Sequence, residues 1–577
     1  MLPRILLFSC AWAISLAQAG PTVSTRYGEV EGFESVGRDG NVAEVFLAIP
    51  YAKPPVGELR FEKPELPEPW TGVYHATQFR NDCTPHMKSA TLMSVYSGED
   101  CLTFNVVRPK GSEGKKLPVL FWIHGGGYEV GSASLHGYKS FVDNYVKHDI
   151  IVVSIQYRLG FLGFFSDGTS EVTGMQGMFD EAAALKFVYD NIDSFGGDRN
   201  EITVWGYSAG AGSVSQLSLS PYSRDYFARS IIMSGSAFAG WATGHQVANH
   251  CLALARVVGC HGPHPKECLK TKSIDELMDA VEIIGGTTDN IDIVKFGPTL
   301  DGDFIPSHPN ELVRDAPVKP TLIGLSRKEG NFFTVLNMLP QIHSFGMSPN
   351  DLKTMNESTI LNVIQRKLLY DNRFGEKQDL AARKIADHYL SRGRPIDIYS
   401  QGNGFFIDRY TEIMSDITFN VPVLREIEKK HEVGTPIWAY MFDYYNDALF
   451  NEQVPEAAKG SPHANEYHYL FEIPMIGQID VNVGEDRQVR DNFIEMVVSF
   501  AKDGQPKVQN KPWDPVQNPK NINFMRFTNN VTADVGLFSE AATFWNSMAH
   551  EGFDVVDPLS SFPTSSSVIS RHFSEEL

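Results

Sequence analysis

The sequence has 577 residues, of which 50 are Lys or Arg and 70 are Asp or Glu, so its formal net charge is −20 at pH 7. With 42% hydrophobic residues, the chain is too apolar for an intrinsically disordered protein. The acidic excess argues against nucleic-acid binding, which requires Lys and Arg to neutralise phosphates. At roughly 150 residues per domain, length alone suggests three or four domains.

The N-terminal residues are typical of a secretory signal peptide. Arg4 supplies the positive charge, an almost wholly apolar stretch follows, and Ala17-Gln18-Ala19 has the small-x-small pattern of a cleavage site. We therefore expect residues 1–19 to be a signal peptide. The alternative is an N-terminal membrane anchor, for which the apolar stretch is short, since a span needs about 20 residues. We expect no later transmembrane segment.

The predicted elements alternate between strands and helices along the chain. The opening, residues 22–51, reads as short antiparallel strands, and a proline-containing, loop-rich stretch continues to about Pro109. A helical pattern covers residues 179–193, and a second one starts after Gly210. Apolar, β-branched runs that predict buried strands are residues 119–123, 150–156, 202–205, 230–233, 321–324 and 437–442.

Strands that are apolar throughout and alternate with helices indicate a large, mostly parallel sheet covered on both faces. The strand candidates continue through most of the chain. We therefore expect one α/β domain with helical insertions over residues 20–555, followed by a polar tail at 556–577, instead of three smaller domains.

Entry into the secretory pathway would make disulfides favourable. One of the six cysteines lies in the predicted signal, which leaves an odd number. We expect two disulfides that close short local loops, Cys83–Cys101 and Cys260–Cys268, with Cys251 as the spare thiol. The sequence has no CxxC pair or HExxH helix, so no metal site or cofactor is expected.

Other features agree with a luminal or extracellular location. Asn356 and Asn530 begin N-glycosylation sequons. The last residues, 574–577, match the end of an ER-retention signal in their final two positions, and the alternative is an ordinary acidic tail. We expect either secretion or residence in the ER lumen.

The residues 206–210 form a Gly-x-Ser-x-Gly motif between a predicted strand and a predicted helix. This sharp turn exposes the serine, here Ser208, at the N-terminus of a helix, where developing negative charge is favoured. The alternative is a glycine-rich turn with an incidental serine. The strand–turn–helix context favours a nucleophile.

A Gly-Gly-Gly run at residues 125–127 follows an earlier strand. Without side chains, its N–H groups can approach a substrate oxygen. We expect the N–H groups of Gly126, Gly127 and Ala209 to form an oxyanion hole. The alternative is a flexible loop at the strand end.

Together with these motifs, several landmarks give the chain a family resemblance. They are Phe46–Ala52, Pro55–Arg60, Glu99–Leu102, Phe195–Asp198 and Ser234–Ser236. The sequence resembles type-B carboxylesterases of the α/β-hydrolase fold, a group that includes cholinesterases and neuroligins, and within it most resembles invertebrate gut-type esterases. The resemblance covers nearly all of the mature chain.

The resemblance implies the other members of a catalytic triad. From the residues alone, the acid is ambiguous among 70 carboxylates and the base among 17 histidines. By resemblance the acid is Glu329, and the base is His463 in a His-x-x-Glu segment, with His468 as the local alternative. A carboxylate in this role holds the imidazole tautomer and stabilises the imidazolium.

These residues predict a serine hydrolase that cleaves carboxylic esters through an acyl-enzyme. An acyltransferase would use the same triad with an alcohol in place of water. A non-catalytic, neuroligin-like adhesion protein is disfavoured because Ser208, Glu329 and His463 are all present. A neutral lipase would need an interfacial lid, which we do not identify.

Departures from the family pattern bear on the substrate. The family usually has Glu before the nucleophile, where this chain has Tyr207, and the Cys83–Cys101 loop has no Trp with which to bind a cationic choline. Neutral small-molecule esters are therefore expected. By resemblance, Trp241 and Val294 line the acyl pocket, although Trp241 is equally well explained as a core residue. Asp292 fits such a pocket poorly, and solvent is the alternative place for it.

Overall fold

The computed structural model describes residues 20–557 except 94–95, 263, 396–402, 510 and 512. The predicted signal peptide and nearly all of the predicted polar tail lie outside these residues. Among the described residues, no helix is both long and apolar enough to cross a membrane.

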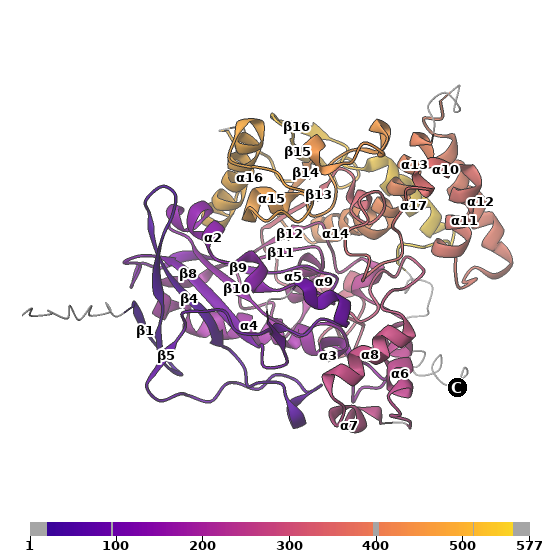
Figure 1. Cartoon of the computed structure of the whole chain (residues 1–577). Helices are drawn as coiled ribbons and strands as arrows, with labels where there is room; N and C mark the ends of the chain where they lie inside the picture. The colour runs from indigo at the N-terminus through magenta and orange to yellow at the C-terminus, as the bar shows by residue number, and fades with distance from the viewer. Residues whose placement is uncertain are drawn as a thin grey trace, which may run out of the picture.

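An 11-stranded mixed sheet is the centre of the fold (Figure 1). Its strands, in spatial order, are β16 (Val531–Val535), β15 (Asn523–Phe527), β14 (Ile437–Phe442), β13 (Thr321–Ser326), β12 (Arg229–Met233), β11 (Gly197–Tyr207), β9 (Leu117–Ile123), β10 (Ile151–Ile155), β8 (Thr103–Pro109), β4 (Val42–Pro50) and β3 (Phe33–Val36). The strands from β15 to β10 pair in parallel, and antiparallel strands extend the sheet at both ends.

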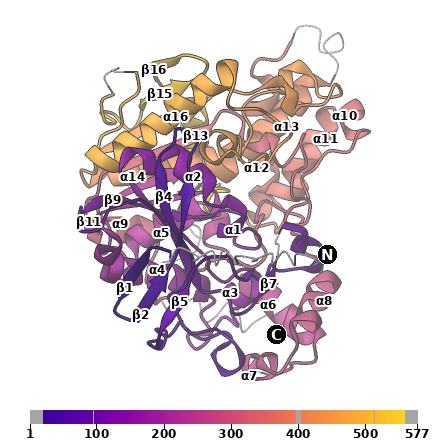
Figure 2. The same cartoon turned by 60° about the vertical axis from the view of Figure 1, so that its left-hand side comes forward.

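The N-terminal part of the chain also forms two smaller sheets. One contains β1 (Thr22–Thr25), β2 (Gly28–Glu31) and β5 (Val73–His75), and the other contains β6 (Asp82–Cys83) and β7 (Ser97–Gly98). The antiparallel pairs β1–β2 and β3–β4 agree with the strands predicted for this region. Figure 2 shows β1, β2 and β5 together on one side of the molecule.

Helices fill the crossovers between strands and the later insertions. Those of the first half are α1 (Ala133–His136), α2 (Lys139–Asn144), α3 (Gly160–Phe164), α4 (Gln176–Asn191), α5 (Ala209–Leu219), α6 (Val247–Val257), α7 (Pro265–Lys270) and α8 (Ile274–Ile284). Those of the second half are α9 (Pro309–Asp315), α10 (Asp351–Thr354), α11 (Glu357–Val363), α12 (Gln378–Ser391), α13 (Gly404–Ser415), α14 (Val421–Glu432), α15 (Glu466–Phe471), α16 (Gly484–Asp503) and α17 (Ser539–His550).

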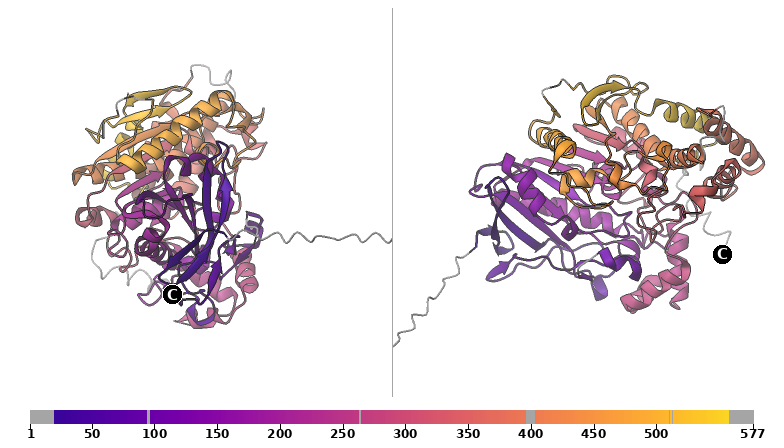
Figure 3. Two further views of the ribbon diagram at one scale, coloured as in Figure 1. Left: turned by 90° about the vertical axis from the view of Figure 1, so that its left-hand side faces the viewer. Right: turned by 45° about the horizontal axis from the view of Figure 1, so that its top comes forward.

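Successive residues of a strand point to opposite faces of the sheet, so each strand contributes side chains to the packing on both faces. Trp122 and Trp205 contact each other and Phe471 of α15 on one face. Phe104 of β8 contacts Phe187 of α4 on the other face. The helices α4 and α15 consequently lie on opposite sides of the sheet, and Figure 3 gives two further views of the sheet with its helices. This is the α/β architecture with helices on both faces that the sequence predicts.

The cysteines are paired as predicted. Disulfides join Cys83 to Cys101 and Cys260 to Cys268. The remaining described cysteine, Cys251, is a buried free thiol. Burial raises the pKa of this thiol to about 12, so it is held in the unreactive protonated form.

Candidate active site

Ser208 lies in the sharp turn between β11 and α5. Its φ of 58° is in the left-handed region, which non-glycine residues rarely adopt. A glycine two residues earlier permits this turn, since a Cβ atom on Gly206 would lie 2.2 Å from the carbonyl oxygen of Gly210. The N–H group of Ser208 donates to the carbonyl oxygen of Met233 on the neighbouring strand β12 (2.8 Å). The turn therefore presents Ser208 at the carboxyl edge of the sheet, at the start of a helix.

The glycine loop after β9 packs directly against this turn. A Cβ atom on Gly125 would lie 2.7 Å from the carbonyl oxygen of Tyr207, so only glycine permits this approach. Gly126 and Gly127 have φ values of 120° and 64°, which favour glycine. Ala209 is the first residue of α5, so its N–H group has no acceptor within the helix. Ser208, Ala209 and these glycines line one cavity.

Glu329 and His463 form a buried pair at the same cavity. Glu329 follows β13 in a 3₁₀ turn and is 0% exposed, and His463 is 3% exposed. Their side chains meet at 2.7 Å between Glu329 Oε2 and His463 Nδ1. Nδ1 is thereby engaged, which leaves Nε2 as the nitrogen available to a reacting group. Ser208 and His463 line the cavity together, and the described residues include no hydrogen bond between their side chains. Such a contact commonly tightens only when substrate binds.

Further hydrogen bonds hold the second oxygen of Glu329. Glu329 Oε1 accepts from the hydroxyl of Ser234 (2.7 Å) and from the N–H group of Ser326 (2.7 Å). No local pattern in the sequence marks these serines as supports of the acid, although Ser234 belongs to a family landmark. These donors, together with His463, fix the orientation of the buried Glu329 side chain.

The cavity wall is otherwise almost wholly apolar. Its hydrophobic and aromatic lining residues are Val130, Leu135, Tyr207, Ala209, Trp241, Ile293, Val294, Phe332, Phe333, Leu339, Ile342, Phe419, Ala464, Tyr467 and Met475. No Asp, Glu, Lys or Arg lines it among the described residues. A wall of this kind favours uncharged substrate groups, because its described residues offer no side chain of Asp, Glu, Lys or Arg to pair with a buried ion.

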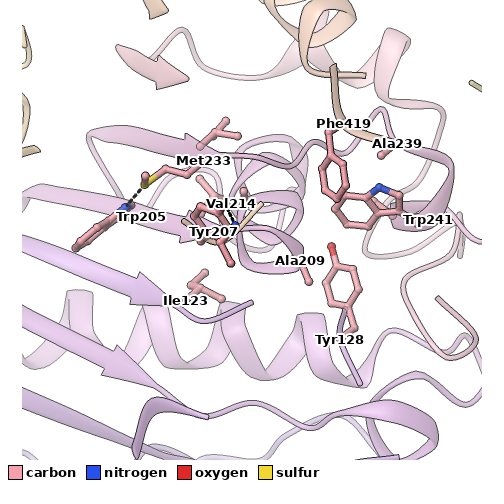
Figure 4. Close-up of a cluster of buried hydrophobic side chains, with 14 of the residues drawn as sticks. Ile123, Tyr128, Trp205, Tyr207, Ala209, Val214, Met233, Ala239, Trp241 and Phe419 are labelled. Carbon is pink, nitrogen blue, oxygen red and sulfur yellow. Dashed lines mark hydrogen bonds between the residues drawn. The ribbon is translucent and has the colours of Figure 1, made fainter. Parts of the chain in front are cut away.

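The structure places both residues that were predicted for the acyl pocket, Trp241 and Val294, on this wall. The indole N–H of Trp241 donates to the carbonyl oxygen of Thr418 (2.7 Å), which fixes the ring. Thr418 lies in a π-helical turn between α13 and α14, and its neighbour Phe419 packs on His463 with ring centroids 4.5 Å apart. Figure 4 shows Trp241, Phe419 and Tyr128 gathered beside Ala209.

Two alternatives from the sequence lie elsewhere. His468 is buried in α15, its Nδ1 is 3.2 Å from the carbonyl oxygen of Asn465, and it does not line the cavity. Asp292 is buried, so the expectation that it faces solvent is wrong. Its carboxylate instead accepts a hydrogen bond from the hydroxyl of Tyr370 (2.5 Å), and Asp292 is not among the residues that line the cavity.

With this geometry established, known proteins can be compared. The model of the carboxylesterase family matches residues 19–545. This chain belongs to the carboxylesterase family. The esterase is 53% identical over 569 residues to Gut esterase 1 of Caenorhabditis briggsae, covering 98% of this chain and 99% of the relative. It is 52% identical over 562 residues to Gut esterase 1 of Caenorhabditis elegans, covering 97% and 98%.

More distant relatives include Esterase FE4 of Myzus persicae, which is 31% identical over 550 residues, 92% of each chain. These relatives confirm the predicted α/β-hydrolase fold, the resemblance to gut-type esterases, and the assignment as a carboxylic ester hydrolase.

A second buried carboxyl lies behind the triad candidates of the esterase. Glu466, three residues after His463, is fully buried. Burial and, to a lesser extent, the charge of Glu329 raise the pKa of Glu466 to about 8. At neutral pH this side chain is therefore mostly protonated, and it places no second negative charge beside Glu329.

Proposed function

We propose that the esterase hydrolyses neutral carboxylic esters through an acyl-enzyme on Ser208. His463 takes the proton of Ser208 while the serine attacks the ester carbonyl, and it then protonates the leaving alcohol. Glu329 holds the imidazole tautomer. The N–H groups of Gly126, Gly127 and Ala209 stabilise the oxyanion, and water repeats the sequence on the acyl-enzyme.

One observation carries this proposal. The buried Glu329–His463 pair, 2.7 Å apart, opens onto the cavity that also holds the strained Ser208 turn and the glycine loop. The choice of neutral esters is supported by the apolar wall. Its members Trp241 and Val294 are proposed to contact the acyl chain, with the small Val294 leaving room for longer chains.

Fluorophosphonate labelling tests the nucleophile. We expect the wild-type protein to be labelled and the Ser208→Ala variant to be inert. Ser215→Ala is the matched control, because Ser215 is a buried serine of the same helix whose hydroxyl has no partner among the described residues. Labelling that survives Ser208→Ala refutes the assignment.

Turnover of p-nitrophenyl esters of increasing chain length tests the reaction class. We expect hydrolysis that extends beyond acetate. Labelling without turnover of any ester, together with ester formation when a second alcohol is added, would indicate acyl transfer instead.

We further propose that residues 1–19 are cleaved as a signal peptide, and that residues 20–555 form one domain followed by a polar tail. The protein would then enter the secretory pathway and be secreted or reside in the ER lumen. Two disulfides agree with an oxidising compartment. Both sequon residues, Asn356 and Asn530, are exposed and open to glycosylation. A glycosidase-sensitive mass shift that is lost in Asn356→Gln/Asn530→Gln tests this proposal.

A further inference from the structure

Tyr207, the residue before the proposed nucleophile, makes two hydrogen bonds with its buried hydroxyl. The hydroxyl accepts from the N–H group of Ala464 (2.6 Å) and donates to Glu466 Oε2 (2.9 Å). Ala464 and Glu466 both belong to the segment that carries His463. A side chain adjacent to Ser208 in sequence thus holds the segment that supplies the proposed base.

The backbone beside His463 needs such a contact. Ala464 has a φ of 65°, in the left-handed region that costs a non-glycine residue roughly 1–2 kcal/mol. The N–H group of His463 itself donates to the carbonyl oxygen of Glu329 (3.3 Å). The two N–H groups on either side of the His463 α-carbon are therefore held, one by Glu329 and the other by Tyr207.

Glu466 extends the network to the proposed acid. Its Oε2 accepts a second hydrogen bond from the hydroxyl of Ser326 (2.8 Å), and the N–H group of Ser326 donates to Glu329 Oε1 (2.7 Å). The network therefore joins Tyr207 to the strand end that orients Glu329. Both donors to Glu466 are hydroxyl groups, and its Oε2 accepts from each of them.

The ring of Tyr207 adds a packing contact to these hydrogen bonds. It lines the cavity and lies 5.0 Å from the His463 ring, centroid to centroid. Replacement of Tyr207 by Phe would keep this contact and remove only the hydroxyl. The two roles of the side chain can consequently be separated by one substitution.

We propose that Tyr207 is a positioning residue for His463, and that its hydroxyl fixes the strained backbone after the base and links it through Glu466 to the support of Glu329. This inference rests on the proposed function of the triad. It concerns the placement of the base, and Tyr207 itself transfers no proton in the reaction.

The test compares Tyr207→Phe with Tyr440→Phe. Tyr440, on β14, is the matched control because its hydroxyl is also buried but has no hydrogen-bond partner among the described residues. For Tyr207→Phe we expect kcat for p-nitrophenyl butyrate to fall about 10- to 100-fold, since misplacement of a catalytic group by about 1 Å can lower a rate 100-fold. KM should stay within about threefold, because the cavity wall keeps its aromatic ring.

The pH dependence of kcat/KM adds a second measurement, which a general loss of stability would not shift. A less firmly held imidazole is stabilised less by Glu329 when it is protonated. The ascending limb of kcat/KM against pH should therefore move to lower pH in Tyr207→Phe and stay in place in Tyr440→Phe. A Tyr207→Phe variant with more than half of the wild-type kcat, or an equal loss in both variants, overturns the proposal.

Ser326→Ala provides a second route to the same network, in case Tyr207→Phe folds poorly. It removes one of the two donors to Glu466 and leaves the contact between Tyr207 and Ala464 intact, so a smaller fall in kcat is expected. A fall larger than that of Tyr207→Phe contradicts the proposal. Hydrolysis that survives Ser208→Ala refutes the proposed function itself, whereas unchanged kcat in Tyr207→Phe with Ser208-dependent activity refutes only the positioning role.

Discussion

Glu466→Gln should make the esterase more stable, by an amount that grows with pH. Burial and the charge of Glu329 raise the pKa of Glu466 from 4.5 to about 8 in the folded protein. The unfolded chain therefore releases this proton at lower pH than the folded chain does. The contribution of Glu466 to the free energy of unfolding is therefore fully present below pH 4.5 and is lost as the pH rises towards 8. A glutamine amide has no proton to lose, and its oxygen can still accept from Tyr207 and Ser326.

The size of the effect follows from the two pKa values. Each unit of difference corresponds to about 1.4 kcal/mol. At pH 7.5, three units above the ordinary value, the buried acid costs about 4 kcal/mol, and at pH 5 it costs about 1 kcal/mol. The stabilisation by Glu466→Gln should consequently be about 3 kcal/mol larger at pH 7.5 than at pH 5.

Urea denaturation, followed by tryptophan fluorescence at both pH values, measures this difference. The comparison requires that the slope of the free energy of unfolding against urea concentration is the same in each variant. Glu452→Gln is the control, since Glu452 is an exposed carboxylate and its replacement reports only the loss of a surface charge. A gain in stability that is equal at pH 5 and pH 7.5, or that matches the gain in Glu452→Gln, would show that Glu466 is not a buried, protonated acid.

Three further substitutions probe other parts of the structure. Gly206→Ala places a Cβ atom 2.2 Å from the carbonyl oxygen of Gly210, so fluorophosphonate labelling should slow by about 100-fold or more, and labelling at the wild-type rate would contradict the turn geometry. Val294→Phe fills part of the cavity wall, so kcat/KM should fall more for p-nitrophenyl octanoate than for acetate; an equal fall for both esters would exclude Val294 from acyl-chain selection. Replacement of Cys260 and Cys268 by Ala opens a loop with a sequence separation of 8 and should lower the free energy of unfolding by about 2–3 kcal/mol in urea denaturation, and an unchanged urea midpoint would contradict this.

The buried strands were the most predictable part of the fold. The run at residues 437–442 corresponds to β14 residue for residue, and residues 321–324 lie within β13. Strands buried on both faces are apolar throughout, so they stand out in a sequence. β8 was missed and placed in a loop-rich stretch. It carries Asn105 inside the sheet, where the side chain bonds to the N–H group of Ala48 and to Ser154. Polar residues that are satisfied by distant partners interrupt the apolar pattern.

The candidate site likewise contains residues that a local motif predicts and residues that no local pattern predicts. Ser208 and the glycine loop lie in local motifs whose backbone requirements can be read from a few neighbouring residues. Glu329 and His463 are 134 residues apart, and only the family resemblance selected them. The contacts of Phe419 and Glu466 depend on where distant segments pack, so no local pattern indicates their roles.

The uncharged cavity wall also affects the end of the reaction. In the proposed reaction the ester enters without charge, whereas the acid released from it ionises in water and becomes an anion at neutral pH. Beyond the N–H groups of the proposed oxyanion hole, a carboxylate product finds no Lys or Arg among the described residues of the apolar wall, and Glu329 lies behind His463, so we expect the product to leave for solvent. Product inhibition by carboxylates should therefore be weak at neutral pH. It should become stronger in acid, where the product is neutral, and the same condition favours the reverse reaction of ester synthesis.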